Sequence, residues 1–369
     1  MNSVKKTKPL LKRRNLYQLA RPIFGIIFLA IILWRLYIVF VMKQQYGSDF
    51  WIRLIISGLI IGGVYSLIAI GYTLVYGILL MINFAHGEVM MIGTFAGYFI
   101  FEAANAITVP TAANPEINIA NAYPAVTILI AFIVGMFIAA ATGFFLEKIA
   151  YRPLRKAPRL IPLISAIGAS IFLQNAAQIL FSPQTRDYDN PSLMARGTGL
   201  DLLIGGSTIK VPYTGIFTFI LSILLMVGLY LLVQKTRLGK SMRAVAMDKP
   251  TASLMGIDVD RTISSTFIIS GALAGAAGVM WGIHNGLVYY FVGFIPGIKA
   301  FTAAVLGGIG NIPGAMLGGM FLGLVESVGP TALDISYQLK DVIAFVILIV
   351  ILIFRPSGIL GEVLAEEKV

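Results

Sequence analysis

The chain has 369 residues, of which 58% are hydrophobic and 12% charged, whereas soluble globular domains average about 45–50% apolar and about 25% charged residues. This balance excludes a soluble domain of ordinary composition, and the absence of cysteine excludes disulfides, thiolate metal sites and thiol redox catalysis. The net charge of +11 is compatible with nucleic-acid binding, but Lys and Arg gather in short clusters beside apolar runs, which is the positive-inside pattern of membrane proteins.

These apolar runs predict an all-α, polytopic helical bundle of about eight or nine transmembrane helices. The spans are expected at residues 22–42, 54–76, 88–101, 124–147, 160–181, 213–234, 262–283, 300–328 as two shorter helices, and 342–354. Each spanning helix needs roughly 20 apolar residues, so a chain of this length has no room for a large soluble domain in addition.

The distribution of charge along the chain predicts its topology. Seven Lys and Arg residues in 1–21 indicate a cytoplasmic tail, followed by an uncleaved anchor and external linker at 22–50. The main transmembrane domain is expected at 51–355. The basic loops 148–159 and 235–261 are predicted to be cytoplasmic, the segments 102–123 and 182–212 external, and the tail 356–369 cytoplasmic.

A polar cluster interrupts the apolar sequence between Leu54 and Phe101. Asn83, His86 and Glu88 lie within six residues of each other, and Gly87 stands among them. Ionisable groups inside a membrane are costly and usually face a protein interior or a water-filled path. We therefore expect these three side chains to line or gate a translocation path; the alternative is that His86 and Glu88 bond each other or the backbone of a broken helix.

A second interruption lies in the other half of the chain, at residues 307–314, and includes Gly307, Gly308 and Gly310. Paired broken helices in two halves of a transporter indicate a binding site at the interface between repeats, so Gly87 and these three glycines are candidate broken-helix or gating positions. Close helix packing is an equal alternative here. It is the preferred interpretation for three glycine pairs, namely Gly58/Gly62, Gly271/Gly275 and Gly314/Gly318.

Enzymatic and metal-binding motifs are not indicated. Gly239-Lys240-Ser241 lacks the earlier glycine of a phosphate-binding loop, where the chain has Gln234, so the chain itself is not expected to bind ATP. The two histidines, His86 and His284, are far apart and do not form a zinc pattern. No Ser-His-acid arrangement for nucleophilic catalysis is present.

The loop 235–261 is expected to contain a short helix outside the membrane. Asp248 can cap it, with Pro250 at an early position, and Gly256 can end it. Leu254, Met255 and Ile257 would be exposed on this helix. An exposed apolar helix can dock into a groove on a partner, or it can lie on the membrane surface.

Four long segments carry a family resemblance: LIAIGYTLVYGILLMINFAHGEVMMIG at 67–93, EKIAYRPLRKAPRLIPLISAIGASIFLQN at 147–175, LMGIDVDR at 254–261 and KAFTAAVLGGIGNIPGAMLGG at 299–319. They resemble the LivH-type permease subunit of the bacterial high-affinity branched-chain amino acid ABC transporter. The resemblance extends from about Phe50 to about Gly361. The anchor before Phe50 and the external segment after Phe101 depart from it.

The resemblance implies an ABC-importer permease fold in the bacterial inner membrane that works by alternating access. It implies a second, LivM-type permease, two cytoplasmic ATPases that bind the ATP, and a periplasmic amino-acid-binding protein as partners, besides lipid and without nucleic acid. By that analogy Arg243, Asp248, Leu254, Met255 and Gly256 belong to the element that couples to an ATPase.

Two other functions fit parts of the same sequence. One is a permease of the same family for urea or short amides, since such relatives share the core motifs. The other is an ion-coupled secondary transporter or channel working through His86 and Glu88. A membrane enzyme is a distant further alternative.

Overall fold

The computed structural model describes residues 25–361, apart from residues 28, 44, 110–116, 156, 159, 196, 205 and 356. The predicted tail at 1–21 and most of the predicted tail at 356–369 lie outside the described residues. Within the described part, nine helices are long and apolar enough to cross a membrane, which confirms the predicted helical bundle.

The spanning helices follow the predicted segments closely. They are the first span Gly25–Lys43, whose end is the π-helical η1 (Ile38–Lys43), and then α2 (Ser48–Leu79), α3 (His86–Ala106), α5 (Pro124–Leu146), α6 (Leu160–Phe181), α7 (Tyr213–Lys235), α10 (Val259–Asn285), α12 (Ile312–Ala332) and α13 (Lys340–Phe354). The short helices η2 (Glu147–Tyr151) and η3 (Arg152–Leu154) continue α5, and η5 (Tyr337–Leu339) precedes α13.

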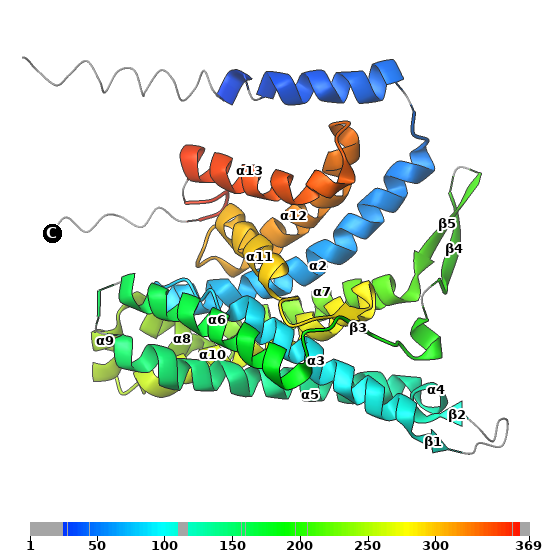
Figure 1. Cartoon of the computed structure of the whole chain (residues 1–369). Helices are drawn as coiled ribbons and strands as arrows, with labels where there is room; N and C mark the ends of the chain where they lie inside the picture. The colour runs from blue at the N-terminus through cyan, green and yellow to red at the C-terminus, as the bar shows by residue number, and fades with distance from the viewer. Residues whose placement is uncertain are drawn as a thin grey trace, which may run out of the picture.

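Helix α2 lies at the centre of the bundle, with α11 (Phe294–Gly307), α12 and α13 on one side of it and α3, α5 and α10 on the other (Figure 1). Most residues of α2 from Gly58 to Ile78 are buried, as expected for a helix that is apolar on all sides. The backbones of α2 and α12 meet at Gly62, where an added Cβ would lie 2.9 Å from Met320 Cα.

The close-packing interpretation is confirmed for all three predicted glycine pairs. Gly58 and Gly62 contact the backbone of α12, Gly271 and Gly275 contact the backbone of α5, and Gly314 and Gly318 contact that of α11. Small residues at such spacing let membrane helices approach closely.

Short antiparallel ribbons occupy one end of the bundle (Figure 1). They pair β1 (Thr108–Val109) with β2 (Ile117–Asn118), β3 (Arg186–Asp187) with β6 (Leu287–Val288), and β4 (Gly199–Ile204) with β5 (Ser207–Pro212). In the longest ribbon Gly199 lies opposite Pro212 and Ile204 opposite Ser207. The short helices α4 (Ile119–Ala122) and η4 (Ser192–Met194) accompany the ribbons.

The opposite end carries α8 (Arg237–Met247), α9 (Lys249–Leu254) and the end of the described C-terminal residues (Figure 1). The segments predicted to be external therefore gather at the ribbon end, and the loop 235–261 lies at the other. Two contacts tie the ribbon end together: Arg53 Nη2 donates to Thr208 O at 2.8 Å, and Lys43 Nζ lies 2.6 Å from Asp334 Oδ2.

The structure differs from the prediction around the second break. Helix α11 begins at Phe294, and its 14 residues measure about 21 Å, which is shorter than the roughly 30 Å hydrocarbon core. Helix α12 has 21 residues and is long enough to cross, so the prediction of two short helices was wrong for the second of them. The apolar run that the prediction followed begins after Lys299, whereas in the structure Lys299 lies within α11, where its ammonium group is paired with acidic side chains.

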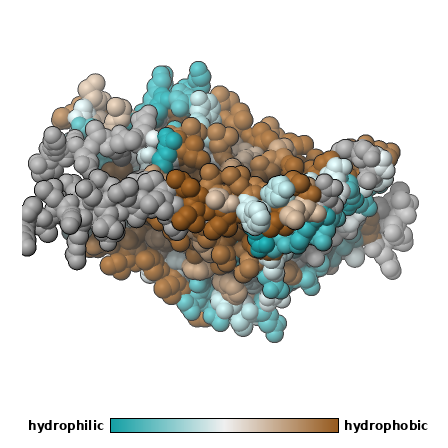
Figure 2. Space-filling view, turned by 90° about the horizontal axis from the view of Figure 1, so that it is seen from above, coloured by the Kyte–Doolittle hydropathy of each residue, from teal (hydrophilic) through white to brown (hydrophobic). Residues whose placement is uncertain are grey.

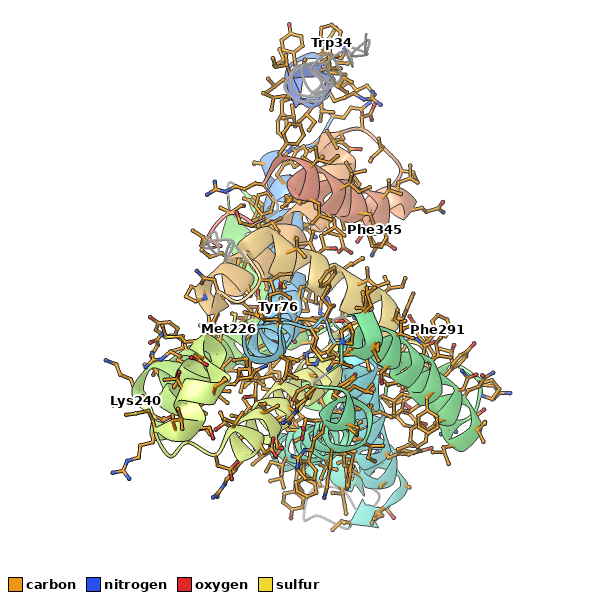
Figure 3. The ribbon with its side chains drawn as sticks, turned by 90° about the vertical axis from the view of Figure 1, so that its left-hand side faces the viewer. Trp34, Tyr76, Met226, Lys240, Phe291 and Phe345 are labelled. Atoms are coloured by element: carbon orange, nitrogen blue, oxygen red, sulfur yellow. The ribbon has the colours of Figure 1, made fainter. Side chains whose placement is uncertain are left out.

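The outer surface is that of a protein surrounded by lipid. Large apolar side chains such as Ile179 and Phe137 are 84% and 72% exposed. On the face shown in Figure 2, hydrophobic residues gather across the middle and hydrophilic residues toward the margins. Trp34 of the first span stands apart from the rest of the bundle (Figure 3).

Candidate functional site

The first helix break separates α2 from α3. Helix α2 ends at Leu79, Leu80 is left-handed with φ 54°, and helix resumes at His86. The interruption predicted near Gly77–Gly87 is therefore confirmed, but it precedes Gly87, which lies inside the first turn of α3. Non-helical backbone at membrane depth is tolerated only where it is buried in protein or lines a cavity.

Asn83 anchors this break. Its side chain is only 3% exposed, and its Oδ1 accepts a hydrogen bond from the Tyr151 hydroxyl at 2.6 Å. Tyr151 is itself 1% exposed and belongs to η2, which follows α5. The break is thus fixed to an element almost seventy positions further along the chain.

His86 occupies a space that a neighbouring glycine leaves open. An added Cβ on Gly71 of α2 would lie 2.1 Å from His86 Nε2, so only glycine at this position admits the imidazole ring. The ring meets Tyr72 edge-on, with the two centroids 4.9 Å apart. His86 is 1% exposed, and its Nε2 has no hydrogen-bond partner among the described residues.

Glu88 points toward α6. Its Oε1 accepts hydrogen bonds from Gln174 Nε2 at 2.7 Å and from Ser170 Oγ at 3.3 Å, whereas its Oε2 has no partner among the described residues. Ser170 and Gln174 stand 10 and 14 residues after Leu160, or about 15 and 21 Å along the helix, which places Glu88 near the middle of that span. In the described part of the chain no hydrogen bond joins Glu88 to His86.

Gly87 is a position of close packing. An added Cβ would lie 2.5 Å from Gly293 O, and a Cβ on Gly293 would lie 1.9 Å from Gly87 O. The N-terminus of α3 therefore rests directly on the chain that enters α11, and neither glycine can carry a side chain without a shift of backbone.

The second break lies between α11 and α12. Gly308 and Gly310 have φ values of 106° and 98°, a region that favours glycine, while Gly307 ends α11 and packs against Gly314. The C-terminal residues fix this break, since Ile359 N donates to Leu306 O at 2.8 Å and Leu360 N to Gly307 O at 3.1 Å.

The two breaks lie beside one small void that has no room for a water molecule. Residues from both breaks and from the helices beside them line it: Tyr72, Tyr76, Ile82, Phe301, Ala304 and Ile309. Tyr76 lies near the middle of the bundle when it is seen from the end that carries α8 and α9 (Figure 3). Segments from opposite halves of the chain thus lie side by side here, and the binding site expected between them stays a prediction.

The loop 235–261 folds into two short helices, α8 and α9. Asp248 caps α9 by accepting from Thr251 N at 3.3 Å, Pro250 lies in its first turn, and Gly256 follows it with φ 82°. The predicted cap, proline position and glycine end are thus all present. Arg243 of α8 bonds the Gln234 side chain of α7, so it fixes α8 to the end of a membrane span.

Three apolar side chains of this pair point into solvent. Met247, Leu254 and Met255 are 90%, 88% and 78% exposed. Ile257, which was expected to be exposed with them, is instead half-buried against the core. We call Met247, Leu254 and Met255 the exposed apolar triad.

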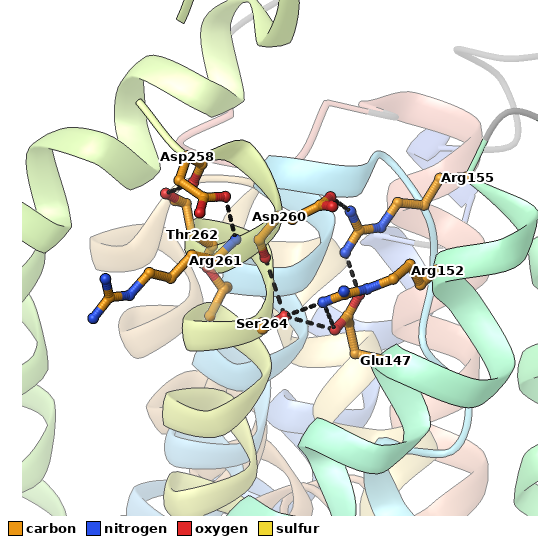
Figure 4. A network of polar contacts seen from close by, with 9 residues as sticks. Glu147, Arg152, Arg155, Asp258, Asp260, Arg261, Thr262 and Ser264 are labelled. Carbon is orange, nitrogen blue, oxygen red and sulfur yellow. Dashed lines mark hydrogen bonds and ion pairs between the residues drawn. The ribbon is translucent and has the colours of Figure 1, made fainter. Parts of the chain in front are cut away.

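A cluster of charges joins the start of α10 to the end of α5 (Figure 4). Glu147 is fully buried, and its carboxylate accepts from Arg152, Arg155 and Ser264. Arg155 also donates to Asp260 in the first turn of α10. We call this cluster the Glu147 clamp. Burial, and secondly the positive charge of Arg155, lower the pKa of Lys249 at the start of α9 below its ordinary value.

Sequence reasoning missed the buried ion pairs of α11 to α13. Lys299 Nζ lies 2.8 Å from Glu326 Oε1 and 2.6 Å from Asp341 Oδ1, and Lys340 lies 3.6 Å from Glu326. The signal was available, because a lone ionisable residue in a membrane span is by default a candidate for function or pairing. The prediction described 300–328 as apolar apart from its glycine break and overlooked Glu326 within it.

A bundle of apolar helices with two buried breaks, and with an exposed helix pair at one end, defines a polytopic membrane protein of the transport class. No solved structure matches the chain. Residues 54–352 match the model of the family described as branched-chain amino acid transport system / permease component. The match begins after the first span.

Two curated relatives extend this likeness over nearly their whole length. The permease protein BraD of the Pseudomonas aeruginosa high-affinity branched-chain amino acid transport system is 43% identical over 320 residues, covering 86% of this chain and 98% of the relative. The corresponding LivH protein of Escherichia coli is 41% identical over 323 residues, with the same coverage of both chains. The D-allose permease protein AlsC of Escherichia coli is 32% identical over only 33% of this chain and 38% of its own.

The chain therefore belongs to the branched-chain amino acid transport system / permease component family. Its relatives are transport permeases that form part of multi-subunit systems, and it is a multi-pass membrane protein.

Proposed function

We propose that this chain is the membrane-spanning permease subunit of an ABC importer that carries leucine, isoleucine and valine across the bacterial inner membrane. The observation that carries the proposal is the 43% identity to a branched-chain amino acid permease over 98% of that relative's length. In this proposal residues 51–355 form the permease domain, residues 22–50 an additional anchor with its linker, and both termini are cytoplasmic.

The exposed apolar triad is the proposed contact with an ATPase. Leu254 and Met255 lie at the end of α9, beyond the spanning helices, and burying such side chains in a groove on a partner is favourable by about 1.5–3 kcal/mol each. Asp248 and Gly256 shape the ends of α9, and Arg243 fastens α8 to α7. Movement of a docked ATPase would therefore reach the membrane spans through a rigid connection.

The break between α2 and α3 is the proposed part of the substrate path. Asn83, His86 and Glu88 supply polar groups in a surrounding of apolar side chains, which suits an aliphatic amino acid whose ammonium and carboxylate groups need a few polar contacts. Gly87, Gly307, Gly308 and Gly310 let the broken helices approach one another or turn. Alternating access between two such permeases would then move the substrate.

Three kinds of partner complete the proposed assembly. They are a second, LivM-type permease, two cytoplasmic ATPases that bind ATP, and a periplasmic binding protein that delivers the amino acid. A permease subunit with this organisation needs no catalytic residues of its own, because the energy comes from ATP hydrolysed by the partners.

Uptake by reconstituted proteoliposomes tests the proposal. Vesicles with the full set of subunits should accumulate radiolabelled leucine only when ATP and the binding protein are present. Accumulation of urea in place of leucine would move the chain to the urea or short-amide branch of the family. Uptake by this chain alone, without ATP, would contradict the ABC mechanism and favour an ion-coupled transporter.

Leu254→Asp tests the coupling element separately. We expect it to prevent co-purification of the ATPases and to reduce ATP-dependent uptake at least tenfold, because a charge would have to be buried at the contact. Leu203→Asp is the matched control, since Leu203 is 81% exposed but lies in β4 at the opposite end. Equal effects of both substitutions would contradict a docking role for α9.

A further inference from the structure

We propose that Glu88, Gln174 and Ser170 form the subsite that receives the ammonium group of the transported amino acid. This inference rests on the proposed function and adds to it a chemical role for one carboxylate together with two residues of α6. His86 is not part of the subsite, since no hydrogen bond joins it to Glu88 in the described part of the chain.

The first argument is the missing counter-charge. Three glutamates are buried in the described residues, Glu88, Glu147 and Glu326. Glu147 contacts two arginines, and Glu326 contacts two lysines. No Lys, Arg or His of the described residues makes an ion pair with Glu88, although a carboxylate buried in a membrane span requires compensation.

The local structure supplies only part of that compensation. Glu88 lies in the first turn of α3, where the helix dipole offers the equivalent of about half a positive charge. Gln174 and Ser170 are neutral donors, and both bond the same oxygen, Oε1. The other oxygen, Oε2, is buried and free of partners among the described residues. A cationic donor placed at Oε2 would complete the site, and an ammonium group with its three N–H donors has the required chemistry.

The second argument is access. The buried residues of α6 form a single stripe at helical spacing, Pro162, Ala166, Ser170 and Ala177, with Gln174 on the same stripe. The remaining faces of α6 carry exposed apolar side chains such as Ile171 and Phe172. Because α6 contacts the bundle along one narrow stripe of residues, few contacts have to break for a ligand to enter beside Glu88, Ser170 and Gln174. Ile92 lies one helical turn beyond Glu88 on α3, and Leu173 precedes Gln174 on α6; both are half-buried. Their apolar side chains suit the aliphatic part of the substrate.

The test uses two fragments of leucine as competitors. The complete complex, without its binding protein, is placed in lipid nanodiscs and equilibrated with radiolabelled leucine. 3-Methylbutylamine keeps the ammonium group and the branched chain but lacks the carboxylate, and 4-methylpentanoate keeps the carboxylate but lacks the ammonium group. The two compounds compete with leucine in wild type, in Glu88→Gln, and in the control Glu102→Gln, which changes an exposed acid of the same helix.

We expect Glu88→Gln to weaken leucine and 3-methylbutylamine by about ten- to a hundredfold, the range of one charge-assisted hydrogen bond, and to leave 4-methylpentanoate unchanged. Gln174→Leu should weaken the amine by about two- to tenfold, and Glu102→Gln should have no effect. Glu88→Asp should restore part of the amine affinity, because it restores the charge.

Three results would overturn the inference. They are unchanged competition by the amine in Glu88→Gln, equal weakening of both fragments in an assembled Glu88→Gln complex, and absence of leucine binding to the wild-type complex. ATP-driven leucine uptake by wild type is measured in parallel. If uptake is present while the fragment pattern fails, the ammonium subsite is wrong and the proposed function stands. If uptake of leucine is absent, the proposed function itself fails.

Discussion

The ion pairs around Lys299 lead to an unequal response to mutation. Lys299 and Glu326 are both less than 5% exposed, and Lys299 contacts Asp341 as well. Removal of Glu326 therefore leaves Lys299 with an acidic partner. Removal of Lys299 leaves two carboxylates with Lys340, which is 32% exposed and lies 3.6 Å from Glu326.

The expected costs follow from this difference. Lys299→Met leaves the buried Glu326 with only the more distant, partly exposed Lys340 and should lower the free energy of unfolding by about 3–5 kcal/mol. Glu326→Leu removes one charge-assisted hydrogen bond and should cost about 1.5–3 kcal/mol. In the double variant the partly exposed Lys340 and Asp341 are left to balance each other. Its free energy of unfolding should equal or exceed that of wild type, because apolar replacement of a buried ion pair is often neutral or stabilising.

Thermal denaturation of the purified chain in detergent, followed by loss of the monodisperse species, measures this order. We expect Lys299→Met to denature at the lowest temperature, Glu326→Leu at an intermediate one, and the double variant at the wild-type temperature or above. A double variant as unstable as Lys299→Met would refute the reasoning, as would costs of the two single substitutions that simply add.

Two further substitutions test the break between α2 and α3. Gly87→Ala should impair folding or assembly, because its Cβ would lie 2.5 Å from the Gly293 carbonyl oxygen. The control Gly77→Ala, whose Cβ would have no heavy atom within 4 Å, should express like wild type. Equal yields of the two variants in a membrane-expression assay would contradict the close packing. Tyr151→Phe leaves the buried Asn83 Oδ1 without the hydrogen bond that it accepts. It should lower the free energy of unfolding by about 1–3 kcal/mol, measured as a lower denaturation temperature. An unchanged temperature would show that water replaces the hydroxyl.

Local sequence signals predicted the elements well. The span at 160–181 coincides with α6, because an apolar run of membrane length between a basic loop and a polar one has few alternatives. The ends of α9 were predictable from Asp248 and Gly256, since capping and positive φ depend on residues within one turn. The two breaks were visible for the same reason, as glycine and polar residues within apolar runs.

The contacts that give the candidate site its chemistry were not predictable in this way. Glu88 and Gln174 are 86 positions apart, and their meeting depends on how α6 packs against α3. The clamp shows the same limit, since Ser264 reaches Glu147 across 117 positions. Hydrophobic periodicity identifies a span but not its neighbours, so neither the missing counter-charge of Glu88 nor the partner of Lys299 follows from sequence alone.

The five residues of η2 connect two parts of the molecule that the proposed mechanism must move together. At its beginning, Glu147 accepts a hydrogen bond from Ser264 of α10 in the clamp, and a turn of four residues joins α9 to α10. At its end, Tyr151 holds Asn83 in the break between α2 and α3. The segment η2 is π-helical, a form that is frequent at functional sites. Both of its hydrogen bonds are buried. A displacement of the first turns of α10 therefore strains the break between α2 and α3 unless one of these hydrogen bonds is broken. In the proposed mechanism these two buried contacts, whose partners can be removed one at a time, carry the movement of α9 and α10 to the break beside Glu88.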